Sequence, residues 1–121
     1  VVRQVLFIPG PLPGMNDFIS TGNRFRYDSH KKKWAVIIGA CVRAAKLKPV
    51  ERAHFEWQWR EKTKGRNPDN FIAMGKKFVL DSLQQCGIIK NDGWSQILGF
   101  RDTWEVSDNP GVVVIIDDLE G

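Results

Sequence analysis

Hydrophobic and polar positions along the chain predict strands and helices that follow one another. Residues 2–9 contain a short apolar run rich in β-forming residues, which predicts a strand. Residues 52–60 alternate strictly, with Phe55, Trp57 and Trp59 on one side, so we expect a half-buried strand. The continuous apolar run at residues 112–116 is typical of a strand covered on both faces.

Apolar residues at helical spacing predict two helices. The first is expected to begin at Asp28 or Ser29, after a loop that reaches from residue 10 to Tyr27, and to end before Pro49. The second begins after Asn67, a good N-cap, and ends at Gly87. Pro68 suits its first position, and Gly75 on its apolar stripe permits close packing.

The remaining segment, residues 95–107, predicts either one strand with a break at Gly99 or two short strands, and residues 108–111 predict a turn. The element order is therefore β-α-β-α-β-β. This order indicates an α+β fold in which a mixed sheet packs against two helices in two layers.

The composition fits one domain over residues 1–121. With 121 residues and 42% hydrophobic content, the chain can bury a core without disulfides or metals. Cys41 and Cys86 lie in apolar helical contexts, so we expect two buried, reduced thiols. There is no signal peptide and no apolar run near the length of a membrane span, which predicts no membrane partner and a cytoplasmic location.

The net charge of +4 and the isoelectric point of about 9.3 are compatible with an anionic partner but do not require one. The basic residues that could contact phosphates fall into three groups: Arg24 and Arg26; Lys31, Lys32 and Lys33; and Lys62, Lys64 and Arg66. These basic residues could equally lie on a solvent-exposed face without binding a phosphate. However, the lysines at 31–33 would lie in the first turn of the predicted helix, where the helix dipole disfavours cations unless a phosphate passes nearby.

Two acids are candidate ligands for a divalent cation. Asp69 lies at the start of the second predicted helix, and Asp92 lies in the loop after it. Each has a structural explanation, since an acid suits a helix start and Asn91-Asp92-Gly93 is turn chemistry. Together with the basic run before them, they could hold Mg²⁺ beside a phosphate.

This site has a geometric requirement. A helix of this length spans about 30 Å, so the segment after Gly87 must return along the helix to bring Asp92 near Asp69. Lys76 lies within about 20° of the same helix face as Asp69, and Lys77 lies further round. Either lysine could reach a phosphate, or both could lie on a solvated face.

Three segments of the chain resemble the RusA family of Holliday-junction resolvases, in particular its phage-type branch. They are Arg-Asn-Pro-Asp-Asn at residues 66–70, Lys-Lys-Phe-Val-Leu-Asp-Ser-Leu at 76–83, and Gly-Ile-Ile-Lys-Asn-Asp-Gly-Trp at 87–94. The resemblance implies a small homodimer in a bacterial or phage-infected cell. It also implies binding to four-way DNA junctions and paired nicks that depend on Mg²⁺, with Mn²⁺ able to substitute.

Carried over to this sequence, the resemblance makes Asp69 and Asp92 metal ligands and places the catalytic lysine at Lys76 or Lys77. It also shows one departure, because Asn67 stands where the family has its first acid. An amide brings no negative charge, so metal binding and cleavage should weaken. Asn67 therefore favours one alternative, a junction-binding protein that does not cleave. A separate alternative is a general binder of single-stranded RNA or DNA that uses Trp57, Trp59 and arginine residues on the sheet.

Overall fold

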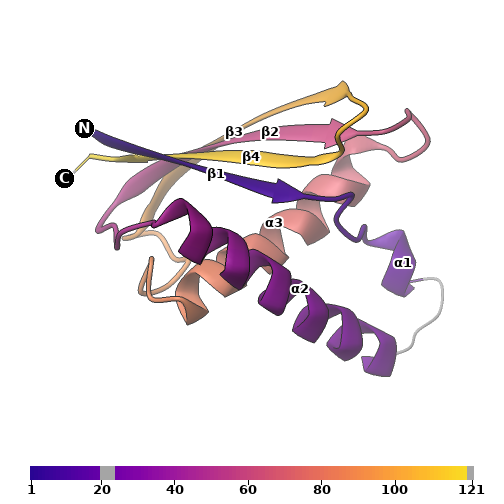
Figure 1. The fold of residues 1–121 in the computed structure, drawn as a ribbon, viewed down its shortest axis with the longest axis horizontal. Helices are drawn as coiled ribbons and strands as arrows, with labels where there is room; N and C mark the ends of the chain where they lie inside the picture. Colours follow the sequence, from indigo (N-terminus) through magenta and orange to yellow (C-terminus); the bar gives the residue numbers. More distant parts are fainter. Residues whose placement is uncertain (20–23, 120–121) are drawn as a thin grey trace.

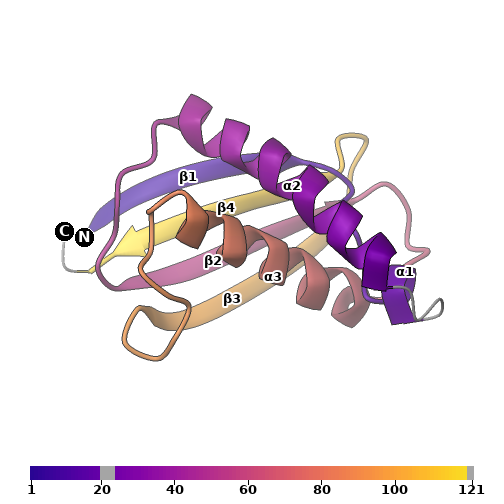
Figure 2. The same cartoon turned by 90° about the horizontal axis from the view of Figure 1, so that it is seen from below.

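The computed structural model describes residues 1–19 and 24–119. The elements in chain order are β1 (Val2–Pro9), α1 (Asn16–Ile19), α2 (Arg24–Ala45), β2 (Ala53–Glu61), α3 (Pro68–Gln85), β3 (Ile97–Val106) and β4 (Gly111–Asp118). The strands form one mixed sheet in the order β1-β4-β2-β3, and α2 and α3 cover a single face of it (Figures 1 and 2). The predicted α+β class and element order are confirmed, with the short α1 as an addition.

The core lies between the helices and the strictly alternating strand β2. Phe55, Trp57 and Trp59 face the helices and are at most 2% exposed. The rings of Trp57 and Trp59 stack with their centroids 5.7 Å apart. The alternation of this segment therefore predicted its buried face correctly, and the polar residues of β2 occupy the open face of the sheet.

Helix α3 begins and ends where its sequence signals predicted. Asn67 precedes Pro68 at the start, although the Asn67 side chain makes no capping hydrogen bond. At the other end Gly87 has a φ of 75°, a conformation that glycine adopts without strain. Gly75 lies against the core, where an added Cβ would be 2.8 Å from the Trp59 ring. The predicted close packing at Gly75 is thus confirmed.

Helix α2 begins at Arg24, about one turn before the predicted start at Asp28 or Ser29. The reason is Tyr27, whose ring stacks on Phe78 of α3 with a centroid distance of 5.8 Å and extends the buried stripe of the helix. The lysines at 31–33 therefore lie beyond the second turn, and the prediction that the helix dipole acts on them is wrong. Residues 20–23 of the predicted loop lie outside the described residues.

The strand β4 is covered on one face only. Val112, Val114 and Ile116 are fully buried against the helices, whereas Val113 and Ile115 are half-buried on the open face. The prediction of cover on both faces is wrong because both long helices pack on the same side of the sheet.

The segment at residues 95–107 contains one strand, β3, with a register shift near the predicted break at Gly99. β3 runs parallel to β2, whereas β4 runs antiparallel to both β2 and β1. The turn after β3 therefore does not close a hairpin. It passes the end of β2, where the backbone N–H of Ser107 donates to the carbonyl of Glu61 at 2.8 Å.

Both cysteines are free thiols. Cys41 is half-buried, but Cys86 is exposed because it is the C-cap residue of α3, so the prediction of two buried thiols is wrong for Cys86. Within residues 1–19 and 24–119, no helix combines the length and the apolar character needed to cross a bilayer.

Candidate functional site

A polar hollow of about 320 Å³ lies at the N-terminus of α3. Asn16, Asn67, Asp69 and Asn70 are among its lining residues. The loop after β1 closes one side of it, because the backbone N–H of Met15 donates to the Asn70 carbonyl at 3.1 Å. The backbone N–H of Asn16 also donates to the side-chain oxygen of Asn70 at 3.0 Å. The hollow thus gathers one carboxylate and several amide groups, which can offer oxygen ligands.

Arg66 holds together the segments that surround this hollow. Its guanidinium donates to both carboxylate oxygens of Glu61 at 2.7 and 2.8 Å and to the carbonyl of Leu12 at 2.8 Å. Gly14 allows the loop to approach, since an added Cβ would lie 2.6 Å from the side-chain oxygen of Asn70 and 3.0 Å from the guanidinium. Arg66, predicted as a phosphate contact, therefore has its charge compensated within the chain and holds the loop to α3.

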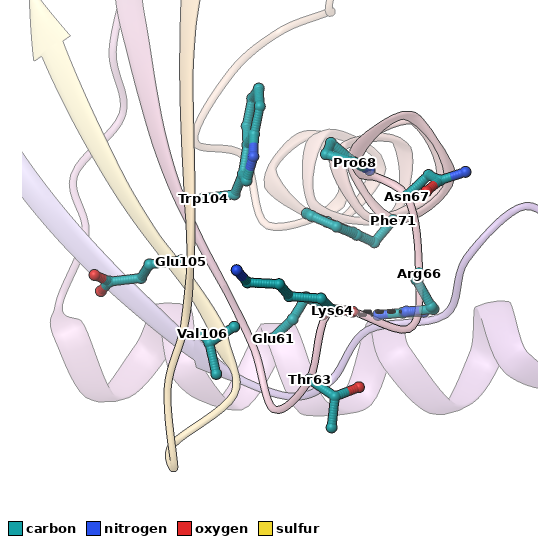
Figure 3. A pocket seen from close by; sticks show the side chains of 10 residues that line it. All are labelled: Glu61, Thr63, Lys64, Arg66, Asn67, Pro68, Phe71, Trp104, Glu105 and Val106. Atoms are coloured by element: carbon teal, nitrogen blue, oxygen red, sulfur yellow. Dashed lines mark hydrogen bonds and ion pairs between the residues drawn. The ribbon is translucent and has the colours of Figure 1, made fainter.

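A second cavity, of about 460 Å³, lies between the start of α3 and the end of β3. Figure 3 shows Pro68 and Phe71 from the helix on one side and Trp104 from β3 on the other. Asn67 lines both this cavity and the polar hollow. The residue that departs from the family motif thus lies between the polar hollow and a cavity with both aromatic and charged lining residues.

Asp92 lies at the opposite end of the molecule from Asp69. The Gly93 carbonyl accepts hydrogen bonds from Gln96 at 3.1 Å and Ile97 at 3.0 Å, which ties the loop to the start of β3. Because β3 runs parallel to β2, its start lies beside the start of β2, next to the C-terminal end of α3 (Figure 2). The 18 residues of α3 span about 27 Å.

The prediction that Asp69 and Asp92 of one chain converge on an ion is therefore wrong. It required the segment after Gly87 to return along the helix. Instead Ile88 and Ile89 are buried in the core, at 4% and 2% exposure, directly after the end of α3. The Ile88 N–H donates to the Leu83 carbonyl at 2.9 Å, which keeps this segment at the helix end. In the part of the chain that the structure describes, no three His, Cys, Asp or Glu residues form a metal-binding group.

The two candidate lysines point in different directions. The Lys76 Nζ lies 2.8 Å from Asp102 of β3 and 4.1 Å from the centroid of the Phe100 ring. Its charge is therefore engaged between α3 and β3. Lys77 is more exposed, and its Nζ lies 3.8 Å from the carboxylate of Asp81. Of the two, Lys77 has the side chain that solvent and phosphates reach more easily.

Sequence reasoning missed Asp102. Its carboxylate accepts both the Lys76 ammonium and, at 2.9 Å, the indole N–H of the buried Trp59. One signal was present in the sequence, because Asp102 is an acid between Phe100 and Trp104 on the apolar side of a predicted strand. An acid at such a position requires a partner.

The basic groups gather loosely at one end of the molecule. The N-terminal half of α2, with Lys31, Lys32 and Lys33, lies at the same end as the start of α3 (Figure 2). Lys62 and Lys64 are exposed in the loop before α3. Arg24 and Arg26 begin α2, but their side chains fall outside the described part of the structure.

The hypothesis of a single-strand binder loses its main support, because Trp57 and Trp59 are buried under the helices and cannot stack on bases. The resemblance to the RusA family rests on the motif residues alone. No protein-family model matches the chain, and no curated protein matches it.

Proposed function

We propose that this protein is a divalent-metal-dependent endodeoxyribonuclease that acts as a homodimer on four-way DNA junctions. The observation that carries the proposal is the polar hollow at the start of α3, which Asp69 and Asn67 of the family-like motif line together, after a loop with the exposed Lys62 and Lys64. The motif at residues 87–94 adds the second acid, Asp92.

The hollow suits a hard cation that keeps several waters. Mg²⁺ is commonly held by one or two carboxylates together with phosphate oxygens of the substrate. Asp69 offers the carboxylate, and the amide oxygen of Asn67 offers a neutral ligand. When bound, the metal would activate a water and stabilise charge on the phosphoryl group. Because Asp92 is distant within one chain, it would join this set only from a second copy.

The surface charge supports DNA as the partner. Lys62 and Lys64 lie in the loop that leads into α3, Lys64 lines the neighbouring cavity of about 460 Å³, and the lysines of α2 lie at the same end of the molecule. Contacts from these residues to phosphates would make binding fall steeply with salt. A four-way junction has approximate two-fold symmetry, so an isologous dimer presents one hollow to each of two equivalent strands.

A second candidate is a junction-binding protein that does not cleave. Asn67 favours it, because an exposed amide replaces a carboxylate at the edge of the hollow. Loss of this negative charge weakens metal affinity and at the same time reduces repulsion of the DNA backbone.

The Asn67→Asp variant tests the proposal. We expect it to raise Mg²⁺-dependent cleavage of a labelled four-way junction by at least about tenfold, since a charge-neutral ligand becomes a carboxylate. Asn109→Asp is the matched control, because it makes the same change at an exposed turn and should leave cleavage unaltered. If Asn67→Asp binds the junction but cleaves no better with Mg²⁺ or Mn²⁺, the non-cleaving candidate replaces the nuclease. Competition with duplex and single-stranded DNA checks junction selectivity.

A further inference from the structure

The face of the sheet away from the helices carries an exposed apolar stripe. Among the described residues, no helix lies on this open face (Figure 1). Val5 and Phe7 of β1 are 53% and 41% exposed, and they pair with the half-buried Ile115 and Val113 of β4. These four side chains form the open-face stripe. Contiguous apolar surface of this kind often marks a site that binds another molecule.

A cavity of about 460 Å³, separate from the one beside Trp104, lies at one end of the open-face stripe. This Arg60 cavity is lined by Phe7, Pro9, Gly10, Arg60, Asn109 and Pro110. Gly111 of β4 pairs with Pro9 on one side and with Arg60 on the other, so its missing side chain leaves space between them. The φ of 151° at Gly111, and the contact that an added Cβ would make with the Ile8 carbonyl, require a glycine at this position.

The walls of the Arg60 cavity are fixed to three strands. The backbone N–H of Gly10 donates to the Pro110 carbonyl at 2.9 Å, which ties the end of β1 to the turn before β4. The N–H of Ser107 donates to the Glu61 carbonyl at 2.8 Å, which ties the same turn to the end of β2. A ligand therefore meets a pre-formed site and loses little affinity to the ordering of a loop.

Arg60 has hydrogen-bond donors that its own chain does not use. Among the described residues that line the cavity, it alone carries a charge. Its Nε is buried and has no hydrogen-bond acceptor in the described part of the chain, and its ion pair with the exposed Glu105 is long, at 3.4 Å. A buried donor of a charged group is costly without an acceptor, and a guanidinium pairs best with a carboxylate or a phosphate. The cavity thus sets an apolar wall beside a cation that lacks a well-placed anion.

The charge of the open face favours a protein partner over a nucleic acid. Arg3 lies 2.8 Å from Asp117, and Arg101 lies 3.8 Å from Glu56, so these arginines are compensated within the chain. In the described part of the chain, none of the four strands carries a lysine. Nucleic acids bind where several cations meet several phosphates, whereas an apolar stripe that ends at one arginine suits a peptide with one carboxylate.

We propose that the Arg60 cavity binds the carboxyl-terminal end of a partner protein whose last residue is large and apolar. The terminal carboxylate pairs with Arg60, the last side chain packs against Phe7, and the preceding residues lie along the open-face stripe. Neighbouring strands lie about 4.8 Å apart, so the backbones of Pro9 and Arg60 are about 10 Å apart across β4. One large residue, held between the tip of the Arg60 side chain and the Phe7 ring, spans this distance.

A chain end fits this cavity better than an acidic residue within a chain. The cavity lies where β1 ends and β4 begins, and Gly10, Asn109 and Pro110 line it there. A segment that runs along the stripe toward the cavity meets these residues, so a continuing chain would have to turn back. A chain end stops there and carries both the carboxylate and the apolar side chain on one residue. Capture of a terminal carboxylate is a recurrent mode of peptide recognition.

The peptide site does not use the residues of the proposed metal site. Arg60 and Phe7 point to the open face of the sheet, whereas Asp69 lies on α3, which packs on the other face (Figure 1). The inference therefore stands without the proposed nuclease activity, and a binding assay on the intact protein tests it.

Fluorescence anisotropy with labelled model peptides tests the site. The probe is Gly-Ser-Val-Ser-Val-Ser-Phe, labelled at its N-terminus, in which the alternate valines would face the stripe. Two matched probes end in a carboxamide or in alanine. The probe with the free carboxylate and phenylalanine should bind saturably and at least about tenfold more tightly than either control, since each control loses the charged pair or the buried ring. Equal affinity of the three probes, or no saturable binding up to about 1 mM, would overturn the proposal.

Substitutions in the cavity separate the two contacts. Arg60→Gln should remove the preference for a free carboxylate over a carboxamide, and Arg60→Lys should restore part of it. Arg101→Gln, at an exposed arginine of the same face, should leave this preference unchanged. Phe7→Thr should reduce the affinity for the phenylalanine end to that for the alanine end, and Val2→Thr, at a 49% exposed valine of the same strand, should not. Circular dichroism checks the folding of each variant. A carboxylate preference that survives in folded Arg60→Gln protein would refute the pairing.

Amide chemical shifts locate the peptide without any substitution. Titration of the wild type with the unlabelled phenylalanine-ended peptide should move the amide signals of residues 5–10, 58–60 and 107–113. Shifts confined to residues 62–70 would place the peptide at the proposed metal site and overturn the Arg60 cavity as its site. Duplex DNA should not displace the labelled peptide, because the open face has no excess of positive charge. Displacement would assign the cavity to phosphate and refute the peptide.

Discussion

The ammonium of Lys76 lies 2.8 Å from a carboxylate oxygen of Asp102 and 4.1 Å above the ring of Phe100, so a residue of α3 is held on the edge strand β3. The two side chains are only 15% and 21% exposed. A pair this sheltered is screened less than an exposed one, and removing one partner leaves a desolvated charge.

Asp102→Asn should therefore destabilise the fold by about 1–2 kcal/mol, because the amide still accepts from Trp59 but no longer balances Lys76. Urea unfolding at matched protein concentration measures this. A double-mutant cycle with Lys76→Met should show coupling of about 1 kcal/mol. Lys77→Met removes a more exposed pair and should cost less than about 0.5 kcal/mol. Equal costs for Lys76 and Lys77 would contradict this account.

Gly75→Ala should destabilise the protein even though alanine is the better helix former. The added methyl would meet the Trp59 ring at 2.8 Å, and such overpacking costs about 1–3 kcal/mol. Gly39→Ala in α2 is the control, since its nearest neighbour is the flexible end of Arg43 at 3.4 Å. That change should be neutral or stabilise by up to about 1 kcal/mol. Thermal melts of both variants measure the two effects, and the prediction fails if both variants shift the melting temperature by the same amount.

The link between β1 and β4 should make stability depend on acid pH. Arg3 donates to both oxygens of Asp117 at 2.8 and 3.0 Å, and these hydrogen bonds hold the pKa of Asp117 below its usual range. The folded state thus gains stability above the unfolded-state pKa of about 3.9 and loses it as pH falls through the lower folded-state pKa. Asp117→Asn should lower the urea midpoint slightly at pH 7, and the difference from wild type should shrink toward pH 3. A difference that grows in acid would refute this linkage.

The two thiols should react at different rates. Burial raises the pKa of the Cys41 thiol, so little of its thiolate is present at neutral pH, whereas Cys86 is exposed at the end of α3. A colorimetric disulfide reagent at pH 7 should therefore show one fast and one slow phase. The fast phase should disappear in Cys86→Ser. Loss of the slow phase in that variant would instead reverse the assignment.

The periodic parts of the sequence predicted most of the fold. The alternation in β2 and the capping signals of α3 are local, so they fixed the buried face of one and the limits of the other. The start of α2 and the cover on β4 were missed because they depend on contacts from elsewhere, namely Phe78 on Tyr27 and the placement of both helices on one face.

The candidate site was predicted only in part, because the direction of the strand after α3 cannot be predicted from the local sequence. Residues 66–70 are local, and their arrangement at the start of α3 follows from the cap. The place of Asp92 depends on whether the strand after the helix runs parallel or antiparallel to β2, which no local pattern encodes. The roles of Lys76 and Arg66 were missed for the same reason, because their partners lie on other elements.

The pairing of β1 with β4, which sets Val2 beside Asp118, brings the start of β1 and the end of β4 to one corner of the sheet, on the strands farthest from β3 (Figure 1). A short peptide could join Val2 to Asp118, and the chain could be reopened at the turn at residues 108–110, giving a circular permutant with the same sheet. Dyes or affinity handles fused at that corner would likewise leave both α3 and β3 unobstructed.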